Sequence, residues 1–177
     1  MRILGIDPGL ANTGYGVIDH DGQRSRFVAA GCIVTAADEA VPQRLRKIHD
    51  GLVAVIDEWK PEVACIEDLF FCTNVRTAIS VAQGRGVAIL ATAHASLLVA
   101  EYTPLQIKQA VAGYGKASKE QVEKMVRAIL ALQQLPETNH AADALAVALC
   151  HAHGCKFQSL VVAAGGPAIA RGKRRYR

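Results

Sequence analysis

The sequence predicts an α/β fold, specifically a three-layer α/β/α domain built on a mixed five-stranded sheet. Three short strand-like segments come first, separated by turn signals, and they predict an antiparallel meander. Amphipathic helical segments then alternate with two further apolar strands, which is the order expected of a sheet covered by helices on its faces. The 177 residues, 51% hydrophobic and 20% charged, suit one globular domain.

The first strand occupies residues 3–6, an apolar run that is too short for a helix. It stops abruptly at Asp7-Pro8-Gly9, so Asp7 stands at the end of a buried strand and before a turn. After a polar loop over residues 11–14, the alternation of a second strand covers residues 15–19. Gly14 and Gly16 predict that another segment approaches this backbone closely.

Residues 24–35 form the expected third strand, and residues 42–59 follow as an amphipathic helix with apolar side chains at three- and four-residue spacing. Residues 63–66 are a fourth apolar strand, which ends in Glu67-Asp68. A long helix is expected over residues 74–94. Its glycines Gly84 and Gly86 predict close packing against the sheet or a second subunit, because glycine weakens an exposed helix.

The remaining elements have clear boundary signals. Residues 97–102 form the fifth strand, Thr103-Pro104 begins a short helix, and Ser118 begins a capping box that opens a helix to about residue 133. Asn139 is the expected N-cap of a final helix over residues 140–153, closed by Gly154. The pattern fades from residue 156. We therefore expect a folded domain over residues 1–155 and a flexible, basic C-terminal tail over residues 156–177.

Acidic side chains stand where two strands end. Asp7 and Glu67 lie side by side if the first and fourth strands are neighbours, and Asp143 and His140 share one face of the final helix. Converging carboxylates repel one another unless a proton or a cation lies between them. Oxygen-rich clusters suit Mg²⁺ or Mn²⁺, and two such ions can activate water and stabilise the leaving oxygen of a phosphodiester.

Charge is segregated along the chain. Five of the 20 Lys and Arg residues lie in residues 171–177, and the rest of the chain is nearly neutral. Between residues 69 and 119, Glu101 is the single acid among five basic residues, which favours a polyanionic ligand. The odd number of cysteines, without a C-x-x-C pair, indicates reduced thiols and a cytoplasmic location. No segment has the length of a membrane span or the pattern of a signal peptide.

These motifs resemble those of the RuvC family of bacterial Holliday junction resolvases, within the ribonuclease H-like nuclease superfamily. The resemblance covers nearly the whole chain in the family's order, apart from the C-terminal tail. The residues that carry it are Ile3-Leu4-Gly5-Ile6-Asp7-Pro8-Gly9, Thr13-Gly14-Tyr15-Gly16, Ile66-Glu67, Gly84-Arg85-Gly86-Val87-Ala88, Gln106-Ile107-Lys108-Gln109 and His140-Ala141-Ala142-Asp143-Ala144-Leu145-Ala146.

The resemblance implies a ribonuclease H-like homodimer that binds four-way DNA junctions and cuts them by paired symmetric nicks in recombination and DNA repair. It implies Mg²⁺ or Mn²⁺, two ions per subunit, held by Asp7, Glu67, Asp143 and His140, although His140 stands where other members have aspartate. His140 is therefore either a ligand that favours Mn²⁺ or a group that positions the nucleophilic water. A RuvA–RuvB branch-migration complex is implied as a partner.

The resemblance also implies positions that contact DNA. Phe70 matches the aromatic residue that stacks on an unpaired base, and Lys108 and Lys119 match basic residues that hold phosphates. Lys116 lies in the same region as these lysines, and Arg76 and Arg85 are further candidates, although Arg85 could equally pack within a dimer interface.

Other interpretations remain open at this stage. Sugar kinases and actin-like ATPases share the opening strand and turn but need a second, duplicated domain, for which 177 residues are too few. A YqgF-type nuclease shares the first aspartate turn, and a non-catalytic junction-binding protein would not require the acids. The soft ligands of the segment Cys150-His151-Ala152-His153-Gly154-Cys155 allow a structural zinc site only if four of them converge.

Overall fold

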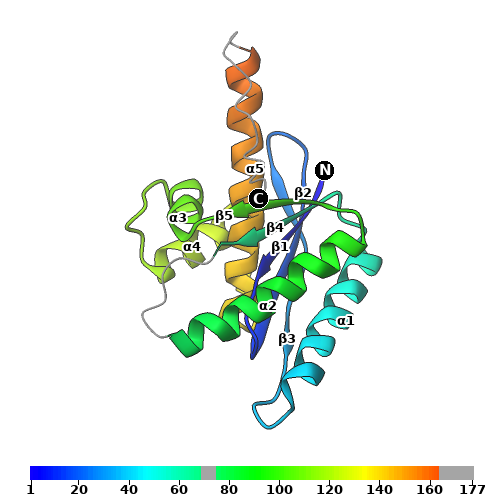
Figure 1. Ribbon diagram of the computed structural model, residues 1–177. Coiled ribbons are helices and arrows are strands. Elements are labelled where there is room, and N and C mark those ends of the chain that lie inside the picture. Colours follow the sequence, from blue (N-terminus) through cyan, green and yellow to red (C-terminus); the bar gives the residue numbers. More distant parts are fainter. Residues whose placement is uncertain (69–74, 164–177) are drawn as a thin grey trace.

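A computed structural model of the chain describes residues 1–68 and 75–163, with side chains for residues 1–68 and 78–154 (Figure 1). The strands are β1 (Arg2–Asp7), β2 (Asn12–His20), β3 (Ser25–Val34), β4 (Val63–Glu67) and β5 (Leu98–Tyr102). The helices are α1 (Val41–Trp59), α2 (Val75–His94), α3 (Pro104–Ala112), α4 (Lys119–Ile129) and α5 (Asn139–Ala163).

The five strands form one mixed sheet in the order β3-β2-β1-β4-β5. The pairs β1–β2 and β2–β3 are antiparallel, which confirms the predicted meander. The pairs β1–β4 and β4–β5 are parallel, and Ile6 is level with Ile66 across β1 and β4. The expected adjacency of the first and fourth strands is therefore confirmed, and both strands end at the same edge of the sheet.

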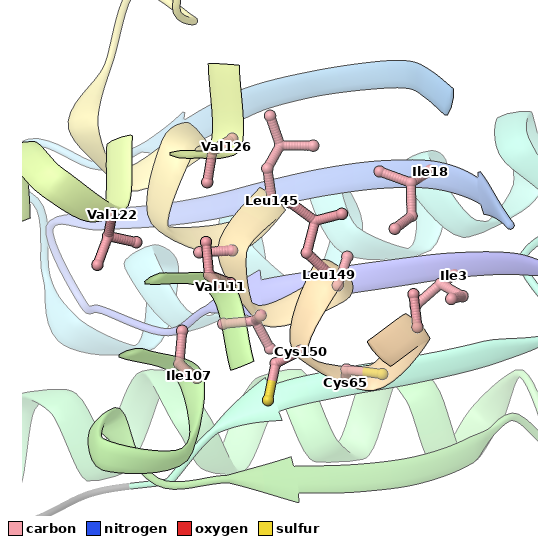
Figure 2. Close-up of a cluster of buried hydrophobic side chains, with 14 of the residues drawn as sticks. Ile3, Ile18, Cys65, Ile107, Val111, Val122, Val126, Leu145, Leu149 and Cys150 are labelled. Atoms are coloured by element: carbon pink, nitrogen blue, oxygen red, sulfur yellow. The ribbon is translucent and has the colours of Figure 1, made fainter. Parts of the chain in front are cut away.

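Helices cover both faces of the sheet, which confirms the three-layer prediction. Helices α1 and α2 lie on one face, whereas α5 crosses the other and continues beyond the sheet (Figure 1). Helices α3 and α4 pack against α5. Leu145 and Leu149 of α5 lie between Ile3 and Ile18 of the sheet and the valines of α4, as Figure 2 shows. Burial of these apolar side chains, at roughly 1.5–3 kcal/mol each, favours the position of α5 on the sheet.

Helix α5 lies directly on the backbone of β1 and β2. Gly5 and Gly16 are cross-strand partners. A Cβ atom on Gly5 would clash with the carbonyl oxygen of Ala144, and one on Gly16 would lie 2.7 Å from the nitrogen of Leu145. A Cβ on Gly14 would clash with the carbonyl oxygen of His140. The close approach predicted at Gly14 and Gly16 is confirmed, and the approaching segment is the final helix.

Helix α2 makes a similar contact with the turn after β1. A Cβ atom on Gly84 would lie 2.8 Å from the carbonyl carbon of Gly9, so the expected close packing is confirmed at this position. A Cβ atom on Gly86 would meet no atom of the described residues within 4 Å, so close packing within the chain is not seen there, and packing against a second subunit stays a prediction. None of the helices in the described ranges combines the length and the apolar character that crossing a lipid bilayer would require.

Several element boundaries differ from the prediction. Strand β2 begins at Asn12 rather than residue 15, because residues 12–14 pair with β3 and with the end of β1. Helix α4 ends at Ile129, and the chain then turns at Ala131, whose φ is 51°. The expected end of this helix at about residue 133 is therefore wrong.

The final helix differs at both of its ends. Its first turn is capped by Thr138, whose Oγ1 accepts a hydrogen bond from the amide of Ala141 at 3.3 Å, and Asn139 is already helical. The helix also continues past Gly154 to Ala163. Gly154 is not among the glycines with positive φ, so it lacks the left-handed conformation that ends a helix. The predicted stop at Gly154 is thus wrong, and residues 156–163 are helical. Residues 164–177 lie outside the described residues, so a flexible basic tail there stays a prediction.

Candidate active site

Strand alternation directs Asp7 and Glu67 to the same face of the sheet. In β1, Ile3 belongs to the core cluster beneath α5, and Asp7 lies an even number of residues further along the strand. In β4, Cys65 belongs to that same cluster, and Glu67 is two residues later. Because β1 and β4 are parallel and in register, both carboxylates lie at one edge of the sheet, on the side of α5.

The first turn of α5 adds the other two predicted side chains. Nδ1 of His140 lies 2.7 Å from Oδ2 of Asp7. One ligand atom each of Asp7, His140 and Asp143 can be chosen so that all three atoms lie within 4.8 Å of one another. The contact of α5 with the β2 backbone at Gly14 holds this turn in place. Residues from positions 7, 140 and 143 therefore meet in one cluster.

Glu67 belongs to the same electrostatic environment. Its pKa is raised to about 7, first by burial and then by the negative charges of Asp7 and Asp143, while Lys119 opposes the shift. The pKa of Asp7 is also raised, mainly by burial, although the hydrogen bond with His140 works in the opposite direction. Burial is thus the main cause of both raised pKa values, and the repulsion among neighbouring carboxylates adds to it.

This donor set fits a divalent cation. A cation in the cluster would relieve the repulsion among Asp7, Glu67 and Asp143. Three carboxylates offer the oxygen ligands that Mg²⁺ and Mn²⁺ prefer. His140 is the exception, because an imidazole nitrogen is a softer ligand. When Nδ1 of a neutral His140 donates to Asp7, its lone pair is on Nε2 and faces away from that hydrogen bond.

Lys119, predicted to contact a DNA phosphate, lies at the rim of this cluster. Its Nζ is 2.7 Å from Oδ2 of Asp143, and half of the lysine side chain is exposed. Partial burial lowers the pKa of Lys119, but the hydrogen bond and charge of Asp143, with the charges of Glu123 and Asp7, raise it overall. Lys119 is the first residue of α4, directly after the N-cap Ser118, so the capping box predicted from the sequence fixes its position.

The other predicted DNA-contacting residues fall into three groups. The α3–α4 segment comprises α3, α4 and the loop between them. Lys108 is half-buried in α3, and Lys116 is exposed in the loop. Phe70 lies outside the described residues, as does the side chain of Arg76, whose backbone belongs to α2. Arg85 pairs with two acidic side chains. Its Nη2 contacts Oδ1 of Asp68 at 3.2 Å and forms a shorter ion pair with Glu101.

The described members of the candidate zinc segment do not converge. Nδ1 of His151 contacts the hydroxyl of Tyr102 at 2.8 Å, whereas Nδ1 of His153 contacts the carbonyl oxygen of Ala110 at 2.8 Å. Cys150 is buried in the apolar cluster beneath α5, and this burial raises the pKa of its thiol to about 12. The side chain of Cys155 lies outside the described residues. This part of α5 therefore packs against its neighbours.

Sequence reasoning misses two features around the site. The first is the contact of Gly5 with α5, which a glycine inside an apolar strand could have indicated. The second is the set of partners of Arg85. Glu101 is the single acid between residues 69 and 119, and a lone acid among bases on a half-buried strand is a signal for an ion pair.

A mixed sheet of this order, with acidic side chains at the ends of β1 and β4 and on the last helix, defines a ribonuclease H-like domain. The family model described as "Crossover junction endodeoxyribonuclease RuvC" matches residues 3–151. The chain belongs to the RuvC family.

Similarity to members of that family extends over most of the chain. RuvC of Finegoldia magna is 49% identical over 160 residues, which cover 90% of this chain and 98% of that protein. RuvC of Desulfitobacterium hafniense is 52% identical over 153 residues, covering 86% and 93% respectively. The structure of T. thermophilus RuvC in complex with Holliday junction substrate matches with a TM-score of 0.85 at 37% identity, covering 89% of this chain and 96% of that one. These matches decide the family question in favour of RuvC.

Proposed function

We propose that this protein is a metal-dependent endonuclease that resolves four-way DNA junctions by paired, symmetric nicks during homologous recombination and DNA repair. One observation carries the proposal. In a chain of the RuvC family, Asp7, His140 and Asp143 meet within 4.8 Å at a sheet edge, and the acids among them raise the pKa of Glu67 beyond the effect of its burial. The carboxylates of Asp7, Glu67 and Asp143 repel one another in this arrangement, and a cation that joins them relieves that repulsion.

Asp7, Glu67, Asp143 and His140 would hold Mg²⁺ or Mn²⁺, with two ions per subunit. When bound, such ions supply a water of lowered pKa and a positive charge beside the leaving oxygen of the phosphodiester. The chain itself positions the ligands, since two lie on paired strands and two on a helix that contacts the strand backbone. His140 either binds the ion through Nε2 or orients the attacking water.

Basic residues beside the cluster would bind the DNA backbone. Lys119 lies within reach of any phosphate that approaches Asp143, and Lys116 and Lys108 extend the positive charge along the same segment. Each phosphate contact contributes sequence-independent, salt-sensitive affinity. Phe70 would stack on an unpaired base, Arg76 would add a further phosphate contact, and the basic residues 171–177 would add nonspecific affinity.

Paired nicks require two active sites, which a homodimer provides. Ile79 and Leu90 are 55% and 48% exposed, and they lie about three turns apart on one face of α2. A second copy of the chain that covered this face would bury both side chains. The RuvA–RuvB complex is the partner that the family resemblance implies. Sedimentation equilibrium tests the dimer, and Ile79→Lys with Leu90→Lys should shift it to monomer.

Cleavage of defined substrates tests the proposed activity. The protein is incubated with an end-labelled four-way junction, the matching linear duplex and an RNA–DNA hybrid, each with Mg²⁺, with Mn²⁺ and with EDTA. We expect symmetric nicks in the junction alone, none in EDTA, and none with Asp7→Asn. Binding without cleavage would favour a non-catalytic junction-binding protein, and preferential cutting of the hybrid would contradict the proposal.

A further inference from the structure

Three charged side chains meet on one face of the sheet. The acidic cluster, which comprises Asp7, Glu67 and Asp143, lies on the opposite face. Arg85 of α2 contacts Oδ1 of Asp68, the residue directly after β4, at 3.2 Å, and it also contacts Oε1 of Glu101 in β5. The three side chains are only 15%, 20% and 23% exposed. Because a half-buried ion pair is screened less than a surface pair, this triad restrains the segments that carry it more than an exposed salt bridge would.

The triad lies next to Glu67 in the chain and beside it in the sheet. Glu67 is level with Tyr102 in the β4–β5 ladder, and the amide of Asp68 donates to the carbonyl oxygen of Tyr102 at 2.8 Å. Ile66 is level with Glu101, so Glu101 points to the side of α2 while Glu67 points to the side of α5. Arg85 therefore fixes the residue after Glu67 from one face of the sheet, while Glu67 faces the cluster on the other.

Glu67 needs such a restraint more than an ordinary strand-end residue does. It is the last residue of β4, where a strand is most free to fray, and the neighbouring carboxylates of Asp7 and Asp143 repel its ionised form. If repulsion displaces the Glu67 carboxylate in the metal-free protein, cation binding must first return it to its position beside Asp7. This cost lowers the apparent affinity for the cation.

We propose that Arg85 is a positioning residue for the acidic cluster: by joining Asp68 and Glu101 it fixes the end of β4 and holds Glu67 beside Asp7. This inference deepens the proposed function and rests on it for its catalytic consequence. The geometry also separates Arg85 from the lysines of the α3–α4 segment. Its guanidinium is matched by two carboxylates, so it offers little free positive charge to a DNA phosphate.

The test compares Arg85→Met, which keeps much of the side-chain length but loses the charge, with Arg85→Lys, which keeps the charge but lacks the planar fork of donors. Arg2→Met is the matched control, because Arg2 forms a 2.9 Å ion pair with Asp19, away from the triad. Glu101→Gln is a second, milder probe of the triad. All variants are first checked for folding by circular dichroism and thermal unfolding.

Two measurements need no cleavage. Calorimetric titration with Mn²⁺ should show a dissociation constant raised roughly tenfold in Arg85→Met, the size of effect expected when a side chain that orients a metal ligand is lost. Arg85→Lys should recover part of this loss, and Arg2→Met should match the unaltered protein. Hydrogen exchange should be faster over residues 63–68 in Arg85→Met alone, because the Asp68–Tyr102 hydrogen bond loses its support.

Kinetics with the junction then separate positioning from DNA binding. We expect Arg85→Met to lower kcat while changing junction affinity in EDTA less than about twofold, since the paired guanidinium has little charge to offer a phosphate. Unchanged Mn²⁺ affinity together with weakened junction binding would overturn the inference and make Arg85 a phosphate contact. If Arg85→Met does not fold, Glu101→Gln tests the inference instead. This variant should also raise the Mn²⁺ dissociation constant, and an unchanged constant would contradict the inference. Failure of the unaltered protein to cut junctions would contradict the proposed function but leave the Mn²⁺ and exchange results to judge Arg85.

Discussion

Lys119 and Asp143 form an ion pair, with Nζ 2.7 Å from Oδ2, although Asp143 also belongs to the cluster that can hold a metal ion. The ammonium group and a divalent cation would therefore compete for the same carboxylate. Lys119 lies at the start of α4 and Asp143 in the first turns of α5, so packing of these two helices brings the competitors together.

Replacement of Lys119 should strengthen metal binding while it weakens cleavage. In Lys119→Met the cluster gains one unit of net negative charge, so we expect Mn²⁺ to bind roughly threefold to tenfold more tightly by calorimetry. Junction binding should weaken at the same time, with a less steep dependence on salt. Lys116→Met, at an exposed lysine of the same segment, should alter junction binding but not Mn²⁺ affinity. Equal Mn²⁺ affinity in all three proteins would contradict the competition.

Replacement of His140 should change which metal supports cleavage. His140→Asp exchanges a nitrogen ligand for an oxygen ligand, which Mg²⁺ prefers. We expect this variant to cleave junctions with Mg²⁺ and to show a lower ratio of Mn²⁺-supported to Mg²⁺-supported rate than the unaltered protein. Parallel rate measurements in the two metals test this. Loss of all cleavage in His140→Asp would show that the imidazole has a role that a carboxylate cannot fill.

The metal-free protein should become less stable as pH rises from about 4.5 to about 7. The pKa of Glu67 is raised from 4.5 to about 7 in the folded state, so in this window the folded protein binds more protons than the unfolded chain. The free energy of unfolding therefore falls with increasing pH, by on the order of 3 kcal/mol for this shift. Chemical denaturation in EDTA across this range measures the effect.

Two variants show whether Glu67 is the source of that dependence. Glu67→Gln should flatten the pH profile over this window, because its side chain does not titrate. Glu58→Gln, at an exposed position of α1, should keep the profile of the unaltered protein. Saturating Mn²⁺ should abolish the loss of stability at neutral pH, since a cation relieves the repulsion among the carboxylates. A steep profile in Glu67→Gln would assign the dependence to other groups.

The glycine contacts beneath α5 should be intolerant of even one methyl group. A Cβ on Gly14 would clash with the carbonyl oxygen of His140, so Gly14→Ala should lower the free energy of unfolding by about 1–3 kcal/mol or more. Gly154 has no atom within 4 Å of a Cβ placed on it, among the described residues. Gly154→Ala should therefore raise stability by about 0.5–1 kcal/mol through helix propensity. Thermal unfolding of the two variants compares a blocked position with an open one.

The positions of Asp7 and Glu67 are predictable from the sequence because local rules determine them. An acid that directly follows a short apolar strand lies at the end of that strand, and the local sequence is enough to predict this. The meeting of Asp7 with His140 and Asp143, beside Glu67, follows from the topology and the family resemblance together. Because a capping box is a local pattern, the predicted N-caps Thr103 and Ser118 are also confirmed.

The features that escape prediction depend on distant partners. Glu101 and Asp68 pair with Arg85 because the β4–β5 pairing brings their segments beside α2. The sequence signals an ion pair at Glu101 but not which base is its partner. Gly154 is expected from its position to end a helix, but a glycine does so only when it adopts positive φ, and here the helix continues. Phe70 and the side chain of Arg76 lie outside the described residues, so their roles stay predictions.

Helix α5 packs directly on the backbone of glycines in β1 and β2, which limits how this protein can evolve or be redesigned. At Gly5, Gly14 and Gly16 the backbone of the strands contacts the backbone of α5 directly. No side chain separates them, so no substitution of a spacer side chain can change the distance. The glycine contacts therefore fix the spacing between helix and sheet more directly than the hydrophobic side chains around them do. Engineering of a new metal preference should therefore alter positions 7, 67, 140 and 143 and keep these three glycines unchanged.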